Sequence, residues 1–129
     1  MSMESASAGR YVMAQLRVIQ ALAVRGLLGP GTALEVVPRA LPRDFEKRDG
    51  RAFRARVADP SDPRRSLVWE LDGKAYSPTE LTSRLWVHYD VLGYPMSHYP
   101  SYYSYWRIVG HELSLWDEWK ALEKTDKKG

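Results

Sequence analysis

The residue types that carry enzyme chemistry are sparse in this chain of 129 residues. Its three histidines, His88, His98 and His111, match neither an i, i+4 pair on a helix nor a zinc-binding spacing. Cysteine is absent, which excludes a thiol nucleophile, a disulfide framework and a cysteine-ligated metal. The sequence contains no nucleophile elbow, phosphate-binding loop or dinucleotide-binding fingerprint. We therefore expect no enzyme activity, no catalytic residues, no bound metal and no cofactor.

Basic residues are concentrated in the first half of the chain. The net charge is +3, to which residues 1–65 contribute +5 (12 Lys and Arg against 7 Asp and Glu) and residues 66–129 contribute −2 (7 against 9). A basic surface is typical of proteins that bind the phosphates of nucleic acids. Within the segment 39–65, five arginines lie in predicted loops without an obvious acidic neighbour and are candidates for phosphate contacts: Arg39, Arg43, Arg48, Arg64 and Arg65.

Two further arginines of this segment have two interpretations. Arg54 and Arg56 alternate with apolar residues in a predicted strand, so they share its outer face. Glu35 and Glu70 would occupy the same face of neighbouring strands, where they would form cross-strand ion pairs of small individual value. Phosphate binding and sheet electrostatics are both open for these two arginines.

Aromatic residues crowd the stretch YPMSHYPSYYSYWR, residues 94–107, which shows no helix or strand period. Tyrosine and tryptophan combine a flat ring with a polar group, and they stack on bases or anchor protein interfaces. In the alternative interpretation, alternate rings of YYSYW fill the edge of a sheet and belong to the core. The candidates for base stacking or partner binding are Tyr99, Tyr102, Tyr103, Tyr105 and Trp106.

The elements that position these residues can be read from the hydrophobic period. Apolar residues at helical spacing predict an amphipathic helix over residues 10–25, which ends at Gly26. Alternation then predicts strands over residues 32–38, 51–58, 66–71 and 105–110. A brief further pairing is expected at residues 74–76.

A capping sequence precedes the central helix. In SPTE, Ser77 is the N-cap, Pro78 occupies the first helical position and Glu80 completes a capping box. The pattern predicts a helix over residues 78–91, closed by Gly93. The side chains expected on its buried side are Leu81, Leu85 and His88.

The capping pattern recurs before a short C-terminal helix over residues 114–124. Together these elements predict an α+β fold, with a small antiparallel sheet of three to four strands packed with an N-terminal, a central and a C-terminal helix. We expect a flexible N-terminus at residues 1–9, a single domain over 10–122 and a flexible tail at 123–129.

Three stretches, in order, resemble one family. GLLGPGTAL resembles a helix exit that leads into a first strand, DGKAYSPTELTSRLW a hairpin turn and helix start, and YWRIVG a closing aromatic strand. Over residues 12–110 the chain resembles the RAMA (restriction enzyme adenine methylase associated) domain, a compact α+β module found beside restriction and methylation enzymes. The resemblance implies recognition of DNA, particularly modified bases, without catalysis. The positions that match the family are Lys74, Ser77, Thr79 and Trp106.

These observations predict a non-catalytic DNA-binding module that reads a modified base, such as a methylated one, through its aromatic loop. A protein-interaction or regulatory module, phage-encoded and acting on a host enzyme, is the alternative. Its anchors would be the same loop and Trp116 or Trp119. In a third interpretation a homodimer buries the loop.

The N-terminal sequence bears on location. MSMESASAGR lacks the apolar region of a signal peptide. The longest apolar run near it, ALAV at residues 21–24, is far short of the roughly 20 residues that span a bilayer. We therefore expect a soluble, cytoplasmic protein with no membrane partner.

Overall fold

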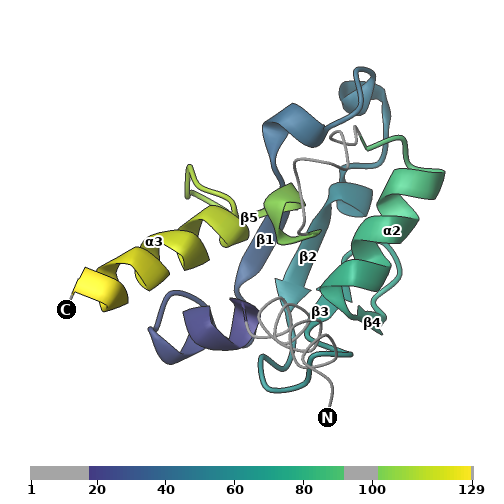
Figure 1. Cartoon of the computed structure of the whole chain (residues 1–129). Coiled ribbons are helices and arrows are strands. Elements are labelled where there is room, and N and C mark those ends of the chain that lie inside the picture. The colour runs from purple at the N-terminus through teal and green to yellow at the C-terminus, as the bar shows by residue number, and fades with distance from the viewer. Residues whose placement is uncertain (1–17, 92–101, 129) are drawn as a thin grey trace, which may run out of the picture.

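The computed structural model describes residues 18–91 and 102–128. Residues 18–24 are helical, and strands and further helices follow. The elements are β1 Ala33–Val36, β2 Arg54–Val57, β3 Leu67–Trp69, β4 Ala75–Tyr76, α2 Pro78–His88, β5 Trp106–Ile108 and α3 Leu115–Lys128 (Figure 1). Short 3-10 turns occupy Pro38–Ala40, Phe45–Lys47, Gly50–Phe53 and Tyr102–Tyr105.

The five strands form one antiparallel sheet in the order β4-β3-β2-β1-β5. The predicted α+β class with an antiparallel sheet is therefore confirmed. The predicted number of three to four strands is one too low, whereas the brief pairing expected at residues 74–76 is present as β4, whose two residues pair with Leu67 and Val68 of β3. Two residues are too few to show an alternation of polar and apolar side chains, so the hydrophobic period does not reveal such a strand.

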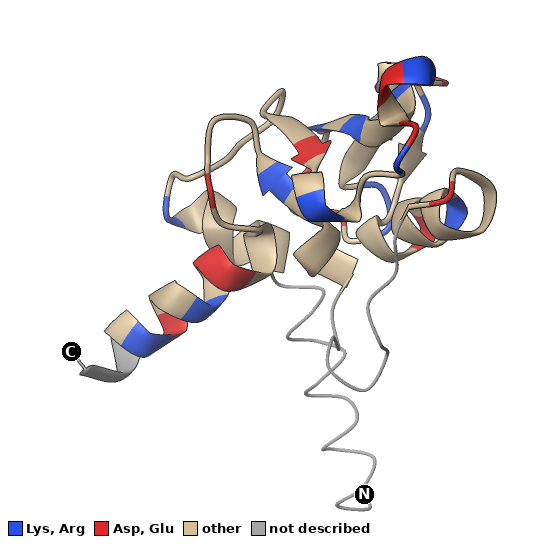
Figure 2. Cartoon of the chain, turned by 90° about the horizontal axis from the view of Figure 1, so that it is seen from above, with Lys and Arg blue, Asp and Glu red and all other residues tan. Residues whose placement is uncertain are grey.

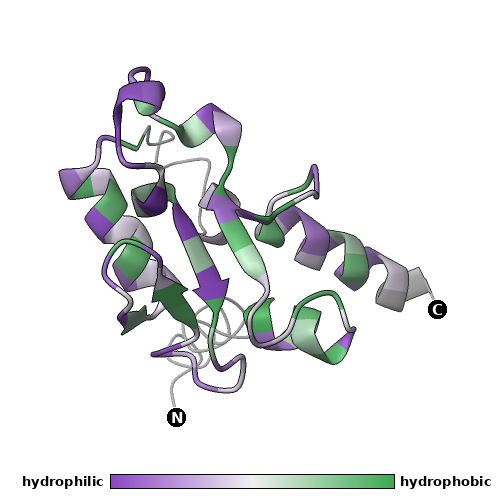
Figure 3. Cartoon of the chain, turned by 180° about the vertical axis from the view of Figure 1, so that it is seen from behind, coloured by the Kyte–Doolittle hydropathy of each residue, from purple (hydrophilic) through white to green (hydrophobic). Residues whose placement is uncertain are grey.

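The helices leave one face of the sheet open. Helix α2 and the helical residues 18–24 lie on one side of the sheet, and α3 runs outward from the β5 end (Figure 1). From the opposite side, β1 and β2 are seen with no helix of residues 18–91 and 102–128 in front of them (Figure 3). The core lies between the sheet and the helices, and its fully buried side chains include Leu22, Leu34, Ala55, Leu67, Leu81, Leu85 and Trp106.

Alternation in β2 separates the two faces of the sheet as predicted. Ala55 and Val57 are buried in the core, whereas Arg54 and Arg56 are exposed on the open face. Phe53 is buried as expected, although it belongs to a 3-10 turn rather than to the strand. The open face is therefore polar because alternate residues of a half-buried strand point away from the core.

Helix α2 begins as predicted. The hydroxyl of Ser77 accepts a hydrogen bond from the N–H of Glu80 at 3.1 Å, and Pro78 occupies the first helical position, where its missing N–H costs nothing. Leu81 and Leu85 are fully buried against the sheet side of the helix, as the period predicts. The sequence signal for this helix start is thus confirmed in its capping geometry.

The end of α2 differs from the prediction. The helix ends at His88 instead of residue 91, and His88 is exposed rather than buried. Two residues later Asp90 has a φ of 57°, a left-handed conformation that interrupts the helix and that aspartate tolerates better than most residues. The predicted closing residue, Gly93, lies outside the described residues.

Helix α3 begins after Ser114, whose hydroxyl accepts a hydrogen bond from the N–H of Asp117 at 3.2 Å. It extends to Lys128, beyond the predicted end at residue 124, so the predicted tail is helical up to that residue. Residues 120–128 contain neither glycine nor proline, and nothing in them stops the helix. Within the described residues, no helix combines the length and apolar character needed to cross a membrane.

Candidate nucleic-acid interface

The structure divides the five candidate arginines and the family-matching positions Lys74, Ser77 and Thr79 between two ends of the sheet. The loop that follows β2 leaves the sheet where Val57 pairs with Leu67. Strand β4 ends beside Leu67 as well, and α2 begins directly after it. Four candidates therefore share this end: Arg64, Arg65, Ser77 and Thr79.

The other candidates lie at the opposite end. The connection from β1 to β2 joins the strand ends at Val36 and Arg54, and the turn between β3 and β4 lies at the same end. This end holds Arg39, Arg43, Arg48 and Lys74. Arginines that lie close together in the sequence, within residues 39–65, are thus separated in space by the length of β2. Their clustering in the sequence does not reveal this separation.

Three candidate arginines present free guanidinium groups. Arg43, Arg64 and Arg65 are exposed, and their side chains have no partner among the residues that the structure describes. The neighbouring Arg51, by contrast, binds Asp49 at 2.7 Å, and its hydrogen bonds hold the pKa of that carboxyl at about 2. An exposed, unpaired guanidinium retains all its donors for a phosphate.

Arg48 is already bound within the protein. Its Nε and Nη2 contact the carboxylates of Asp44 and Asp90, each at 2.8 Å, and its Nη1 donates to the carbonyl of Tyr89 at 2.9 Å. The hydrogen bonds to Asp90 and Asp44, in that order, raise the pKa of the Arg48 guanidinium. The prediction that Arg48 lacks an acidic partner is wrong: one partner, Asp44, lies four residues before it, and the other, Asp90, lies 42 residues after it.

The start of α2 is only partly available to an anion. The Ser77 hydroxyl is committed to the cap, whereas Lys74 and Thr79 are exposed. The carboxylate of Glu80 lies in the first turn and pairs with Arg84 at 3.6 Å. A negative charge at this position opposes a phosphate, so we expect Arg64 and Arg65 to supply most of the attraction at this end.

The aromatic candidates lie mostly in the core. Tyr103, Tyr105 and Trp106 are buried, and burial raises the pKa of Tyr103 well above its usual value. The exposed stacking surface predicted for these three residues is therefore contradicted. They belong to the core, as in the alternative interpretation, but as residues of the 3-10 turn Tyr102–Tyr105 and the start of β5 and not as alternate residues of a strand. Tyr102 is half-buried, and Tyr99 lies outside the described residues.

The open face of the sheet carries charges of both signs. Glu70 contacts Arg54 at 3.0 Å and Arg56 at 3.4 Å, and Glu35 contacts Arg107 at 3.2 Å. Acidic and basic residues are interspersed along the strands (Figure 2). The cross-strand ion pairs that were one of the two interpretations of Arg54 and Arg56 are thus present.

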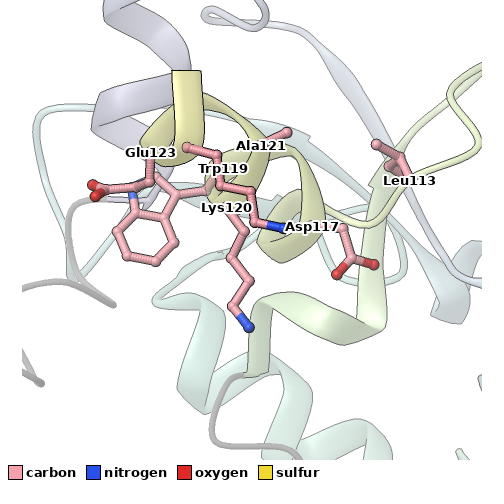
Figure 4. Close-up of a pocket in the computed structure, with 7 residues that line it drawn as sticks. Leu113, Asp117, Trp119, Lys120, Ala121 and Glu123 are labelled. Atoms are coloured by element: carbon pink, nitrogen blue, oxygen red, sulfur yellow. The ribbon is translucent and has the colours of Figure 1, made fainter. Parts of the chain in front are cut away.

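An open groove beside α3 was not anticipated from the sequence. Its volume is about 620 Å³, and Leu113, 49% exposed, stands at one end (Figure 4). The half-buried Trp116 and Trp119 lie side by side, with ring centroids 4.9 Å apart. The residues that line the groove are Leu113, Asp117, Trp119, Lys120, Ala121, Glu123 and Lys124.

Known proteins add no assignment to this geometry. No family model, curated protein or solved structure matches the chain. The resemblance to the RAMA domain therefore stays a prediction. In the parts of the chain that the structure describes, His, Asp and Glu form no group of three that could hold a metal ion.

Proposed function

We propose that the protein is a non-catalytic module that binds DNA through the phosphate backbone. The principal contact is the end of the sheet at which the loop bearing Arg64 and Arg65 lies beside the start of α2. The exposure of these two adjacent guanidinium groups, without described partners, is the observation that carries the proposal.

The contrast with other arginines supports this choice. A side chain that already binds a carboxylate has fewer donors left for a phosphate, and the carboxylate repels that phosphate, whereas an unpaired side chain has neither disadvantage. Arginines that contact an acidic side chain include Arg48, Arg51, Arg54, Arg56, Arg84 and Arg107.

The proposed binding depends more on the charge of the phosphate backbone than on the identity of the bases. Tyr103, Tyr105 and Trp106 are buried in the core, so they are not offered as stacking residues. Contacts to phosphates fix position on a duplex but carry no direct sequence information. We therefore expect similar affinity for unmodified, N6-methyladenine and 5-methylcytosine duplexes of one sequence.

Fluorescence anisotropy of a labelled duplex tests the proposal. The double substitution R64A/R65A should weaken binding and reduce the dependence of log K on log salt by about two, roughly one for each lost phosphate contact. The double substitution K120A/K124A removes the same charge from α3 and should leave both quantities nearly unchanged. Equal losses in the two variants would reduce the effect to net charge and contradict the proposed site.

The groove beside α3 favours a second candidate function, the binding of another protein. Leu113 is 49% exposed, and Trp116 and Trp119 supply aromatic anchors of the kind that dominate protein interfaces. An aromatic interface responds weakly to salt, whereas DNA binding weakens steeply. Binding that is insensitive to salt and is lost in Trp119→Ala would favour this candidate.

A further inference from the structure

We propose that the open face of the sheet is a second DNA-contacting surface, in which Arg54 and Arg56 bind phosphates and Glu70 limits their affinity. This inference rests on the proposed function, because it extends the same backbone binding from the Arg64–Arg65 loop across the sheet. The occupant to which it commits is the phosphate backbone of a DNA duplex.

The geometry of β2 presents the two arginines together. Arg54 and Arg56 are alternate residues of the central strand, so both side chains leave the same face. Their side chains are 52% and 58% exposed although both contact Glu70. The closest contact of each is through Nε, the inner nitrogen of the guanidinium. Since a guanidinium has five N–H donors, a contact at Nε leaves others for a phosphate oxygen.

The carboxylates of this face are less exposed to solvent than its two most exposed arginines. The side chains of Glu70 and Glu35 are 22% and 27% exposed, about half the values for Arg54 and Arg56. The face also holds three arginines against two glutamates, since Arg107 pairs with Glu35. The charge that this face exposes is therefore mainly that of Arg54 and Arg56, which gives the charge complementarity that a phosphate backbone requires.

The position of β2 connects the two separated groups of cations. Arg64 and Arg65 follow one end of the strand, and Arg43 and Lys74 lie at the other end. Among the described residues, no helix stands in front of β1 and β2 on this side (Figure 3). The register partners of Arg56 on the two neighbouring strands, Ala33 of β1 and Val68 of β3, are uncharged. A duplex laid along this face would reach cations at both ends of the sheet.

Glu70 gives the inference a direct test. Because its carboxylate faces both arginines, Glu70→Gln should free them without removing a cation, and DNA should bind roughly threefold tighter or more at low salt. Glu123→Gln makes the same change of charge on α3, away from the sheet, and serves as the matched control. Equal affinities of the two variants would overturn the inference.

A second variant keeps this test distinct from the test of the proposed function. R54A/R56A, with its fold checked by circular dichroism, should reduce the salt dependence of binding by about two. A loss of binding in R64A/R65A together with unchanged binding in R54A/R56A would overturn this inference and leave the proposed function intact. A wild-type protein that binds no duplex at low salt would overturn both.

Discussion

The indole N–H of Trp106 donates a hydrogen bond to the hydroxyl of Thr82 at 2.8 Å, within the core. The bond ties β5 to α2, and both residues are almost completely buried. A buried indole N–H without a partner would lose the hydrogen bond that it makes to water in the unfolded chain. The partner on α2 thus explains how Trp106 is accommodated inside the protein instead of on a binding surface.

Replacing the hydroxyl should therefore reduce stability. Thr82→Val keeps the shape of the side chain but leaves the Trp106 N–H without an acceptor, which should cost about 1 to 3 kcal/mol of unfolding free energy. Urea denaturation followed by tryptophan fluorescence measures the change. Thr125→Val, which removes an exposed hydroxyl bonded to the carbonyl of Ala121, is the control and should stay within about 0.5 kcal/mol of the wild type. Equal effects would mean that the buried bond contributes nothing.

Arg48 should act on the fold and not on DNA. Its guanidinium contacts Asp44, which precedes the 3-10 turn Phe45–Lys47, and also Asp90 and the carbonyl of Tyr89, and so joins this turn to the end of α2. Arg48→Gln should lower the urea midpoint and leave the salt dependence of DNA binding unchanged. Arg43→Gln, in the same connection but without a described partner, should leave the midpoint unchanged. A lower salt dependence in Arg48→Gln would restore Arg48 as a phosphate contact.

The ion pair of Asp49 and Arg51 predicts a measurable titration. Hydrogen bonds from Arg51 lower the pKa of Asp49 from 3.8 to about 2. A lowered pKa in the folded state contributes stability above the ordinary pKa, and this contribution is lost as the pH falls toward about 2. Carboxyl-detected NMR should show the pKa of Asp49 rising toward its ordinary value in Arg51→Gln, although not fully, because the backbone N–H of residue 51 still donates to the carboxylate. An ordinary pKa in the wild type would mean that the pair does not persist in solution.

Tyr76 and Asp72 predict a dependence of stability on pH. The Tyr76 hydroxyl donates to Asp72 at 2.6 Å, and this bond raises the pKa of Tyr76. Burial works to raise the pKa of Asp72, but hydrogen bonds from Tyr76 and the Lys74 N–H outweigh it and lower that pKa. The Asp72 contribution is therefore lost as the pH falls through its lowered pKa, and the Tyr76 contribution as the pH rises through its raised one.

Tyr76→Phe tests these signs. The variant should be less stable than the wild type by about 1 kcal/mol between about pH 5 and pH 9, since it lacks one hydrogen bond. The difference should shrink below about pH 4 and above about pH 10. Urea denaturation over this range gives the two curves. A difference that is independent of pH would assign the loss to packing and not to the hydrogen bond.

Local sequence patterns predicted the faces and starts of elements better than features that lack such a pattern. The alternation of residues 53–57 and the SPTE cap depend on a few adjacent side chains, and both faces of β2 and the start of α2 follow them. The end of α2 depends on the left-handed conformation of Asp90, and the sequence does not signal this conformation because the residue is not a glycine. β4 is too short to have a period.

The candidate site was harder to predict because exposure depends on the tertiary structure. Nothing in YYSYW distinguishes rings that stack on a ligand from rings that fill the core, and Tyr103, Tyr105 and Trp106 are buried. The arginines within residues 39–65 likewise have similar sequence surroundings. Which of them remain unpaired is decided by partners as distant as Asp90.

The salt dependence of wild-type binding to a labelled DNA duplex tests the central claim most directly. If Arg64, Arg65 and the open sheet face bind phosphates, log K should fall linearly with log salt, with a slope of about 0.9 for each phosphate contact. Two contacts from the loop alone would give a slope of about two in magnitude, and the sheet arginines would make it steeper. An affinity that does not change between low and moderate salt, or no binding at low salt, would contradict the account.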